Sequence, residues 1–68
     1  MKNKEDSGSY IAVNENPIVL CSYGYSAADA FRQMSKLLKK HQENFPHSSI
    51  NAVSSSYEED VHFVTVYV

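Results

Sequence analysis

The last eight residues, from Val61 to Val68, constrain the fold most because they are apolar on both sides of an extended strand. Seven of the eight are β-branched or aromatic, the residue types that strands favour. Alternation places Val61, Phe63, Thr65 and Tyr67 on one face, and His62, Val64, Val66 and Val68 on the other. A single helix covers only one of these faces. We therefore expect another subunit or a partner to cover the face that the helix leaves free.

A second pattern predicts an amphipathic helix that begins after Ser26 and ends close to Asn44. Ser26 stands where a side-chain oxygen caps a first turn, and Asp29 follows three residues later at the positive end of the helix dipole. Pro46 disfavours helical geometry at the residue before it. The apolar stripe recurs at spacings of three and four and contains Ala27, Ala30, Phe31, Met34, Leu37, Leu38, His41 and Phe45.

Three more segments are predicted to be strands. Residues 10–13 and 18–23 flank an Asn- and Pro-containing break, which predicts a hairpin with a loop of about four residues. Residues 50–57 form a polar strand whose apolar parity changes between Ala52 and Val53, as a β-bulge requires. A polar turn at 58–60 then leads into the last strand.

This order predicts an α+β fold class with two layers. We expect an antiparallel sheet of about four strands in ββαββ order, with one amphipathic helix packed on one face. Residues 1–8 are polar and have nothing to bury, so they are predicted to form a disordered N-terminal tail. Residues 9–68 are predicted to form a single small α+β domain.

The size of the chain favours self-association. The chain has 68 residues and one cysteine, so it cannot close an internal disulfide. A domain this small often depends on a disulfide, a metal or a partner, because its core supplies only about 3–5 kcal/mol. We expect a homo-oligomer whose interface contains Phe63, Val64, Val66 and Val68, since an apolar strand that ends the chain invites pairing at a sheet edge.

The same sequence predicts a cytoplasmic protein without a membrane partner. No apolar run approaches the roughly 20 residues that span a bilayer, and no apolar segment follows the N-terminal lysines. The net charge of -2 provides no general attraction to nucleic acid or to anionic lipid.

The segment between the second strand and the helix is the best candidate for a small-ligand site. Gly24 is free to adopt unusual dihedral angles, and backbone N–H groups beside two tyrosines would bind an anion or a flat ligand. A glycine that only permits the strand-to-helix turn is the commoner case. The candidate ligand-binding residues are Ser22, Tyr23, Gly24, Tyr25 and Ser26.

A basic stripe on the helix contains Arg32, Lys36, Lys39 and Lys40. Such a stripe would track phosphates while tyrosines stack on bases. The favoured interpretation is a solvated helix face, because lysines near the C-terminal end complement the helix dipole and the chain is acidic overall. A further alternative is that the stripe of one subunit meets the acidic turn at 58–60 of another.

The cysteine and the histidines predict neither a metal site nor catalysis. His41, His47 and His62 match no known spacing of zinc ligands. Cys21 stands among strand residues without a neighbouring base, which favours a buried structural thiol. His41 is expected at the edge of the core. We therefore expect no catalytic residue, no metal and no cofactor.

The portion from Tyr23 to Val68, a helix followed by two strands that end in an alternating apolar run, resembles the layout of dodecins, which are small oligomeric flavin-binding proteins. The chain departs from that family in having no tryptophan to stack on flavin and an additional N-terminal strand. The resemblance implies that a chain of this layout is stabilised by assembly and binds ligands between subunits.

The favoured functional hypothesis is a small non-enzymatic binding or regulatory protein of a bacterial or phage type. It would act through protein–protein interaction as a homo-oligomer. The alternative is a carrier or sequestering protein for a small nucleotide- or flavin-like ligand, with its sites at subunit boundaries. Single-stranded nucleic-acid binding along the helix is the third and least favoured hypothesis.

Overall fold

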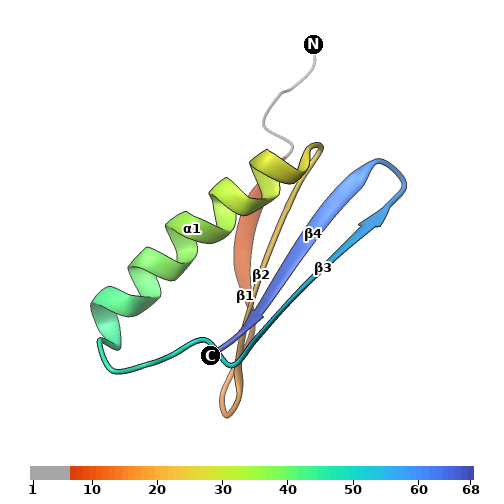
Figure 1. Cartoon of the computed structure of the whole chain (residues 1–68). Coiled ribbons are helices and arrows are strands. Elements are labelled where there is room, and N and C mark those ends of the chain that lie inside the picture. The colour runs from red at the N-terminus through yellow and green to blue at the C-terminus, as the bar shows by residue number, and fades with distance from the viewer. Residues whose placement is uncertain (1–6) are drawn as a thin grey trace.

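The computed structural model describes residues 7–68 and contains four strands and one helix (Figure 1). The elements in chain order are β1 (Gly8–Asn14), β2 (Ile18–Gly24), α1 (Ala27–Asn44), β3 (Ala52–Glu58) and β4 (Val61–Tyr67). The predicted α+β class and ββαββ order are therefore confirmed. No helix of the described part is long and apolar enough to cross a membrane.

The strands form one antiparallel sheet in the order β1-β2-β4-β3. The last strand, β4, therefore lies inside the sheet, where it pairs with β2 on one side and with β3 on the other. Our expectation that this strand offers a free edge is wrong. Its high apolar content is explained instead by its central position, since both of its neighbours shield it from water.

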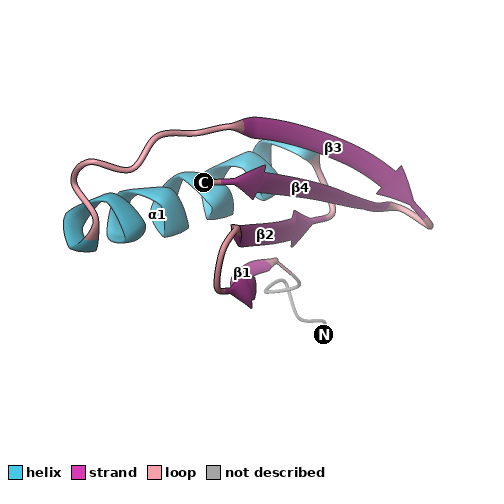
Figure 2. Ribbon diagram, turned by 90° about the horizontal axis from the view of Figure 1, so that it is seen from below, coloured by secondary structure: helices cyan, strands magenta, loops and turns pink. Residues whose placement is uncertain are grey.

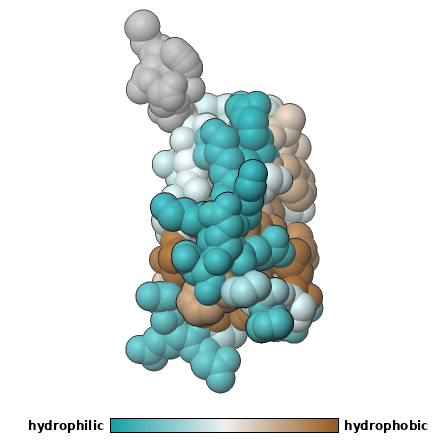
Figure 3. Space-filling model, turned by 90° about the vertical axis from the view of Figure 1, so that its left-hand side faces the viewer, coloured by the Kyte–Doolittle hydropathy of each residue, from teal (hydrophilic) through white to brown (hydrophobic). Residues whose placement is uncertain are grey.

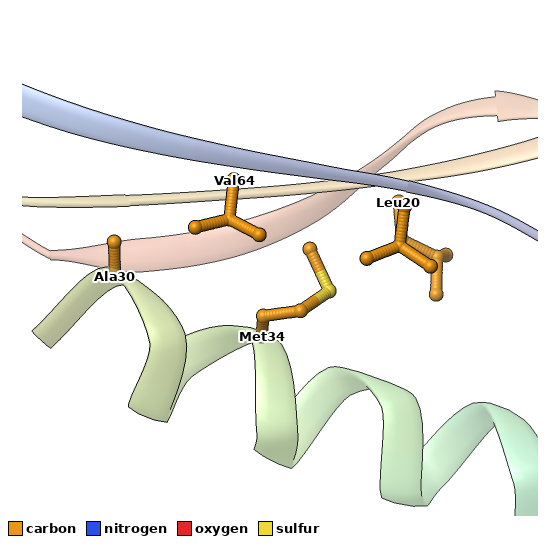
Figure 4. Close-up of a cluster of buried hydrophobic side chains, with 5 residues drawn as sticks. Leu20, Ala30, Met34 and Val64 are labelled. Carbon is orange, nitrogen blue, oxygen red and sulfur yellow. The ribbon is translucent and has the colours of Figure 1, made fainter. Parts of the chain in front are cut away.

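The helix packs across one face of the sheet, mainly on β2, with smaller contacts to β4 and β1 (Figure 2). The core lies between these layers and contains Leu20, Ala30, Met34, Val64 and Val66 (Figure 4). Leu20 and Ala30 are fully buried, and Met34 is 3% exposed. The sheet thus has one face that α1 covers and one that it leaves uncovered.

The position of the helix corrects the predicted oligomer interface. Val64 and Val66 point toward α1 and are only 2% and 1% exposed, so they are core residues and cannot reach a partner. Val68 is partly buried and packs against the same core. Phe63 lies on the opposite, uncovered face because it alternates with Val64. Of the four predicted interface residues, only Phe63 lies on that uncovered face.

The predicted helix bounds are confirmed at both ends. The Ser26 side chain accepts a hydrogen bond from the Asp29 backbone N–H at 3.1 Å, which caps the first turn. The helix ends at Asn44, and the Phe45 N–H donates to the His41 carbonyl at 2.8 Å. Both ends were readable from the sequence because capping is a local interaction.

Three details of the sheet differ from the sequence-based expectation. The first strand begins at Gly8, inside the predicted tail of residues 1–8, while residues 1–6 of that tail lie outside the described residues. The first hairpin has a shorter loop than predicted, because Asn14 already pairs with Ile18.

The bulge lies in β1 between Ile11 and Val13, whereas β3 pairs with β4 in unbroken register. The predicted bulge in β3 is therefore wrong. The apolar residues of β3 change faces between Ala52 and Val53 because α1 does not cover this strand, so neither face has to be apolar.

The N-terminal half of α1 approaches β2 very closely. The buried Ser22 hydroxyl donates to the Ala30 carbonyl at 2.7 Å. A Cβ atom built on Gly24 would lie 2.8 Å from the Asp29 Cβ and 2.9 Å from the Ala30 backbone nitrogen. Glycine is therefore required here by the helix backbone, which leaves no room for a methyl group.

We predict that Gly24→Ala lowers the free energy of unfolding by about 1–3 kcal/mol, the usual loss when a well-packed site is overfilled. The matched control is Gly8→Ala in β1, where the nearest atom to an added Cβ is the mobile end of the Tyr23 side chain. This control should cost less than about 0.5 kcal/mol. Chemical denaturation of both variants measures the difference, and equal losses would contradict the proposed backbone contact.

The turn between β3 and β4 carries backbone strain that a substitution can relieve. Its two central residues, Glu59 and Asp60, have φ values of 52° and 69°, as a type I′ turn requires. Glutamate is poorly suited to this left-handed region, whereas asparagine tolerates it. We predict that Glu59→Asn stabilises the chain by about 0.5 kcal/mol and raises Tm. Glu58→Asn removes the same charge from a strand position and should give no gain.

Candidate functional site

The uncovered face of the sheet is the largest surface that the fold leaves without a packing layer (Figures 1 and 2). Its residues follow from the register of the four strands. They are Gly8, Tyr10, Val13, Val19, Cys21, Tyr23, Ala52, Ser54, Ser56, Glu58, Val61, Phe63, Thr65 and Tyr67. Glu58, at one corner, is the one charged residue among them.

Aromatic and apolar side chains dominate this face. Tyr10 is 51% exposed and Tyr67 is 39% exposed, while Tyr23 and Phe63 are cross-strand partners and half-buried. Val19 is only 8% exposed although no layer covers it, because Val13 and Tyr67 flank it on the neighbouring strands. These side chains shield one another only in part, so much apolar surface remains open to solvent.

The middle of the uncovered face holds the cysteine. Cys21 pairs with Tyr10 on one side and with Thr65 on the other, and its Sγ lies 3.8 Å from the Thr65 Oγ1. Charge repulsion from the neighbouring Cys21, and a hydrogen bond that the Tyr10 hydroxyl donates to it, raise the pKa of Tyr10 above its usual value. The thiol is half-buried rather than enclosed in the core, which corrects the expectation of a buried structural cysteine.

A groove of about 270 Å³ runs on the helix side of the sheet, where α1 stops short of β3. Residues of three elements line it: Ala27 and Phe31 of α1, Ser55, Ser56 and Tyr57 of β3, and His62, Phe63 and Val64 of β4. Ser56 and Phe63 alternate with their neighbours, so their side chains point to the uncovered face. Phe31 is 48% exposed and Tyr57 is 61% exposed, so two aromatic rings of the walls are accessible.

The floor of this groove is ordered by contacts within the β3–β4 hairpin. The Tyr57 and His62 rings lie opposite each other with centroids 4.6 Å apart. The Tyr57 hydroxyl donates to the Asp60 Oδ1 at 3.1 Å, and this hydrogen bond raises the pKa of Tyr57. The phenol is thus held beside the acidic turn.

A smaller cavity of about 110 Å³ lies at the other end of the helix. Its walls include Ile11, Leu20, Leu37, His41 and Phe45. His41 is 7% exposed and packs against the Phe45 ring at 4.9 Å, as expected for a histidine at the edge of the core. Its Nε2 has no hydrogen-bond partner within residues 7–68.

The predicted ligand segment, residues 22–26, does not form one site. Ser22 and Gly24 are buried and used by the packing of α1 onto β2. The Ser26 hydroxyl caps the helix, and Tyr23 belongs to the uncovered face. Tyr25 is 57% exposed in the connection. These residues line neither of the two cavities described above.

The predicted basic stripe is exposed along the outer side of α1, where Figure 3 shows a hydrophilic band. Arg32 is paired with Asp29 of the same helix. The stripe therefore lies on the layer opposite the uncovered face with its aromatic side chains. Lys36, Lys39 and Lys40 belong to α1, whereas Tyr10, Tyr23 and Tyr67 lie on the uncovered face of the sheet.

The titratable side chains do not gather into a metal or catalytic centre. Within residues 7–68, no three His, Cys, Asp or Glu side chains are placed to hold a metal ion. His41 and His62 line different cavities. Cys21 lies beside Tyr10 and Thr65 rather than beside a histidine.

The sequence does not reveal the groove, because Phe31 belongs to the apolar stripe of the helix and is therefore expected in the core rather than in the wall of a groove. The helix covers β2 and β4, so the Phe31 side chain points past them toward β3. The serine run at 54–56 was the available signal, because a strand with three successive serines is suited to an uncovered position at an edge.

Comparison with protein family models, curated proteins and solved structures gave no match. The candidate surfaces therefore rest on their own geometry and chemistry.

Proposed function

We propose that the chain is a non-enzymatic binding protein that acts through protein–protein interaction as a homodimer, assembled through the uncovered face of its sheet. The observation that carries this proposal is the composition of that face. Aromatic and aliphatic side chains extend over β1, β2 and β4 on this face, and its one charge, Glu58, lies at a corner. Exposed contiguous apolar patches on small proteins are typical of interaction surfaces.

The lack of charge favours a second copy as the occupant. A face that meets its own copy must be self-complementary, and like charges in its middle would oppose pairing. The middle here contains Cys21, Thr65 and Phe63 and no aspartate, glutamate, lysine or arginine. Two such faces stack with about 10 Å between the sheets and leave both helices outside.

The size of the face sets the strength of the expected association. Four strands of seven residues cover roughly 400 Å² in projection, given a spacing of about 4.8 Å and a rise of about 3.3 Å. Side-chain relief increases the accessible area, but the interface remains at the small end of specific ones, near or below about 800 Å² per partner. We therefore expect a dimer that depends on concentration in the micromolar range.

The structure offers less support for the other two hypotheses. In a ligand carrier built on residues 22–26, the Ser22 and Ser26 hydroxyls are not available to a ligand, because both already bond to the helix backbone. Nucleic-acid binding needs cations and stacking rings on one surface. In this chain, the lysines of α1 and the tyrosines of the uncovered face lie on opposite layers.

We predict that Phe63→Arg converts the dimer into a folded monomer. The arginine introduces a charge into the middle of the apposed faces, but the uncovered face of a monomer leaves it in water, so the fold is retained. Sedimentation equilibrium at several concentrations measures the mass, and circular dichroism checks the fold. Lys36→Glu on the outer side of α1 is the control and should leave the dimer unchanged.

The reactivity of Cys21 reports which surface is used. In a face-to-face dimer the thiol is covered, so a thiol reagent should react more slowly with the wild type than with Phe63→Arg. A dimer that pairs sheet edges would leave this thiol reactive. A wild-type chain that stays monomeric at high micromolar concentration, with a fully reactive Cys21, would rule out the proposed assembly.

A further inference from the structure

The two edges of the sheet differ in how well they are protected. The edge strand β1 contains a bulge between Ile11 and Val13, a feature that disrupts pairing with a further strand. The other edge strand, β3, pairs with β4 in unbroken register from Ala52 to Glu58. It contains no proline and no lysine, and all seven of its residues are exposed. One side of its backbone therefore presents unpaired N–H and C=O groups.

The groove lies directly beside this open edge. Ser55 and Tyr57 of β3 form one wall, and Phe31 of α1 forms the other. Its volume of about 270 Å³ exceeds the roughly 150 Å³ of a cavity that holds benzene. A strand added to β3 places alternate side chains on the helix side, and one large side chain would enter the groove.

The acidic turn lies at the end of the same strand. Glu58, Glu59 and Asp60 follow one another there, and the one ion pair within residues 7–68 is between Arg32 and Asp29. The three carboxylates therefore have no cation partner in the described chain. A basic side chain at one end of an added strand would complement them.

We propose that β3 and its groove bind an extended peptide segment of a partner protein, which adds to the sheet as a fifth strand. The segment places an aromatic or large aliphatic side chain between Phe31 and Tyr57 and a lysine or arginine against the acidic turn. Backbone hydrogen bonds along β3 supply affinity, and these two side chains supply specificity.

A second copy of β3 fits this site less well. Antiparallel pairing centred on Ser55 would place Val53 of the second copy opposite Tyr57 and Ala52 opposite Glu58. The large side chain of the second copy, its Tyr57, would lie opposite Val53, which does not line the groove, and no cation would meet the turn. The chemistry of the site therefore favours a different partner, and the proposal does not depend on the dimer proposed above.

The test is a selection of displayed random seven-residue peptides on the full chain. We expect enriched peptides to alternate apolar and polar residues, with one aromatic residue on the groove side and a basic residue near one end. Methylation of the peptide nitrogens that face β3 should weaken binding about tenfold or more, because it removes donors to the strand. Glu59→Lys should abolish the preference for the basic residue.

Two variants with the same substitution localise the binding. Ser55→Trp fills the groove from the helix side and should weaken binding of the enriched peptide about tenfold, whereas Ser54→Trp points to the uncovered face and should change it less than about twofold. Phe31→Glu charges the opposite wall and provides a second test if Ser55→Trp does not fold. Phe63→Arg should retain peptide binding even if it abolishes the dimer, so the two proposals can fail separately.

Three results would overturn this inference. The first is a selection on the wild type that enriches no peptide above the Ser55→Trp background. The second is an enriched peptide that binds Ser55→Trp or Phe31→Glu as well as the wild type. The third is loss of self-association in Ser55→Trp but not in Phe63→Arg, which would identify a second copy as the occupant of the β3 edge.

Discussion

The packing of one helix on a four-stranded sheet is the constraint on which the rest of this structure depends. A helix with its side chains is about 10 Å wide, whereas four strands spaced by about 4.8 Å extend over a greater width. The helix therefore packs mainly on β2 and contacts β4 and β1 on either side, but it does not reach β3. Leu20, Met34, Val64 and Val66 fill the contact and bury the middle of the sheet on that side.

This mismatch in width creates two surfaces of different character. The uncovered face is broad, uncharged in its middle and lined by aromatic rings, which suits it to another flat apolar surface. The edge at β3 is narrow and lined by serines, with a groove on one side and carboxylates at one end. Its backbone groups suit an extended segment. One sheet thus offers two candidate surfaces of different chemistry, its uncovered face and its β3 edge.

The close approach of α1 to β2 is what holds this arrangement in register. The Ser22 hydroxyl bonds to the Ala30 carbonyl, and Gly24 leaves room for the helix backbone. Ser22 and Gly24, which the sequence suggested for ligand binding, therefore act in the fold itself. Because they fix the position of the helix over β2, they also determine how far Phe31 extends beyond β4 toward β3.

Local signals made most of the secondary structure predictable. The Ser26 cap, the apolar stripe and Pro46 give the helix bounds because each acts within a few residues. The β-branched composition of the last run predicts a strand for a similarly local reason. The uncovered face was predictable only in part: Phe63 was assigned to an interface, but Val64 and Val66 were assigned with it and are buried under α1.

Alternation along the sequence by itself determined that the last strand has two apolar faces, but it did not determine which face the helix covers. That choice depends on pairing between segments far apart in the chain, since β4 lies between β2 and β3 and presents Val64 and Val66 beside Leu20 and Ser22. Only the tertiary structure decided this register. The physical reason is that the buried face packs against Ala30 and Met34 of the helix. This packing depends on many contacts between segments that are distant in sequence, so no local sequence pattern specifies it.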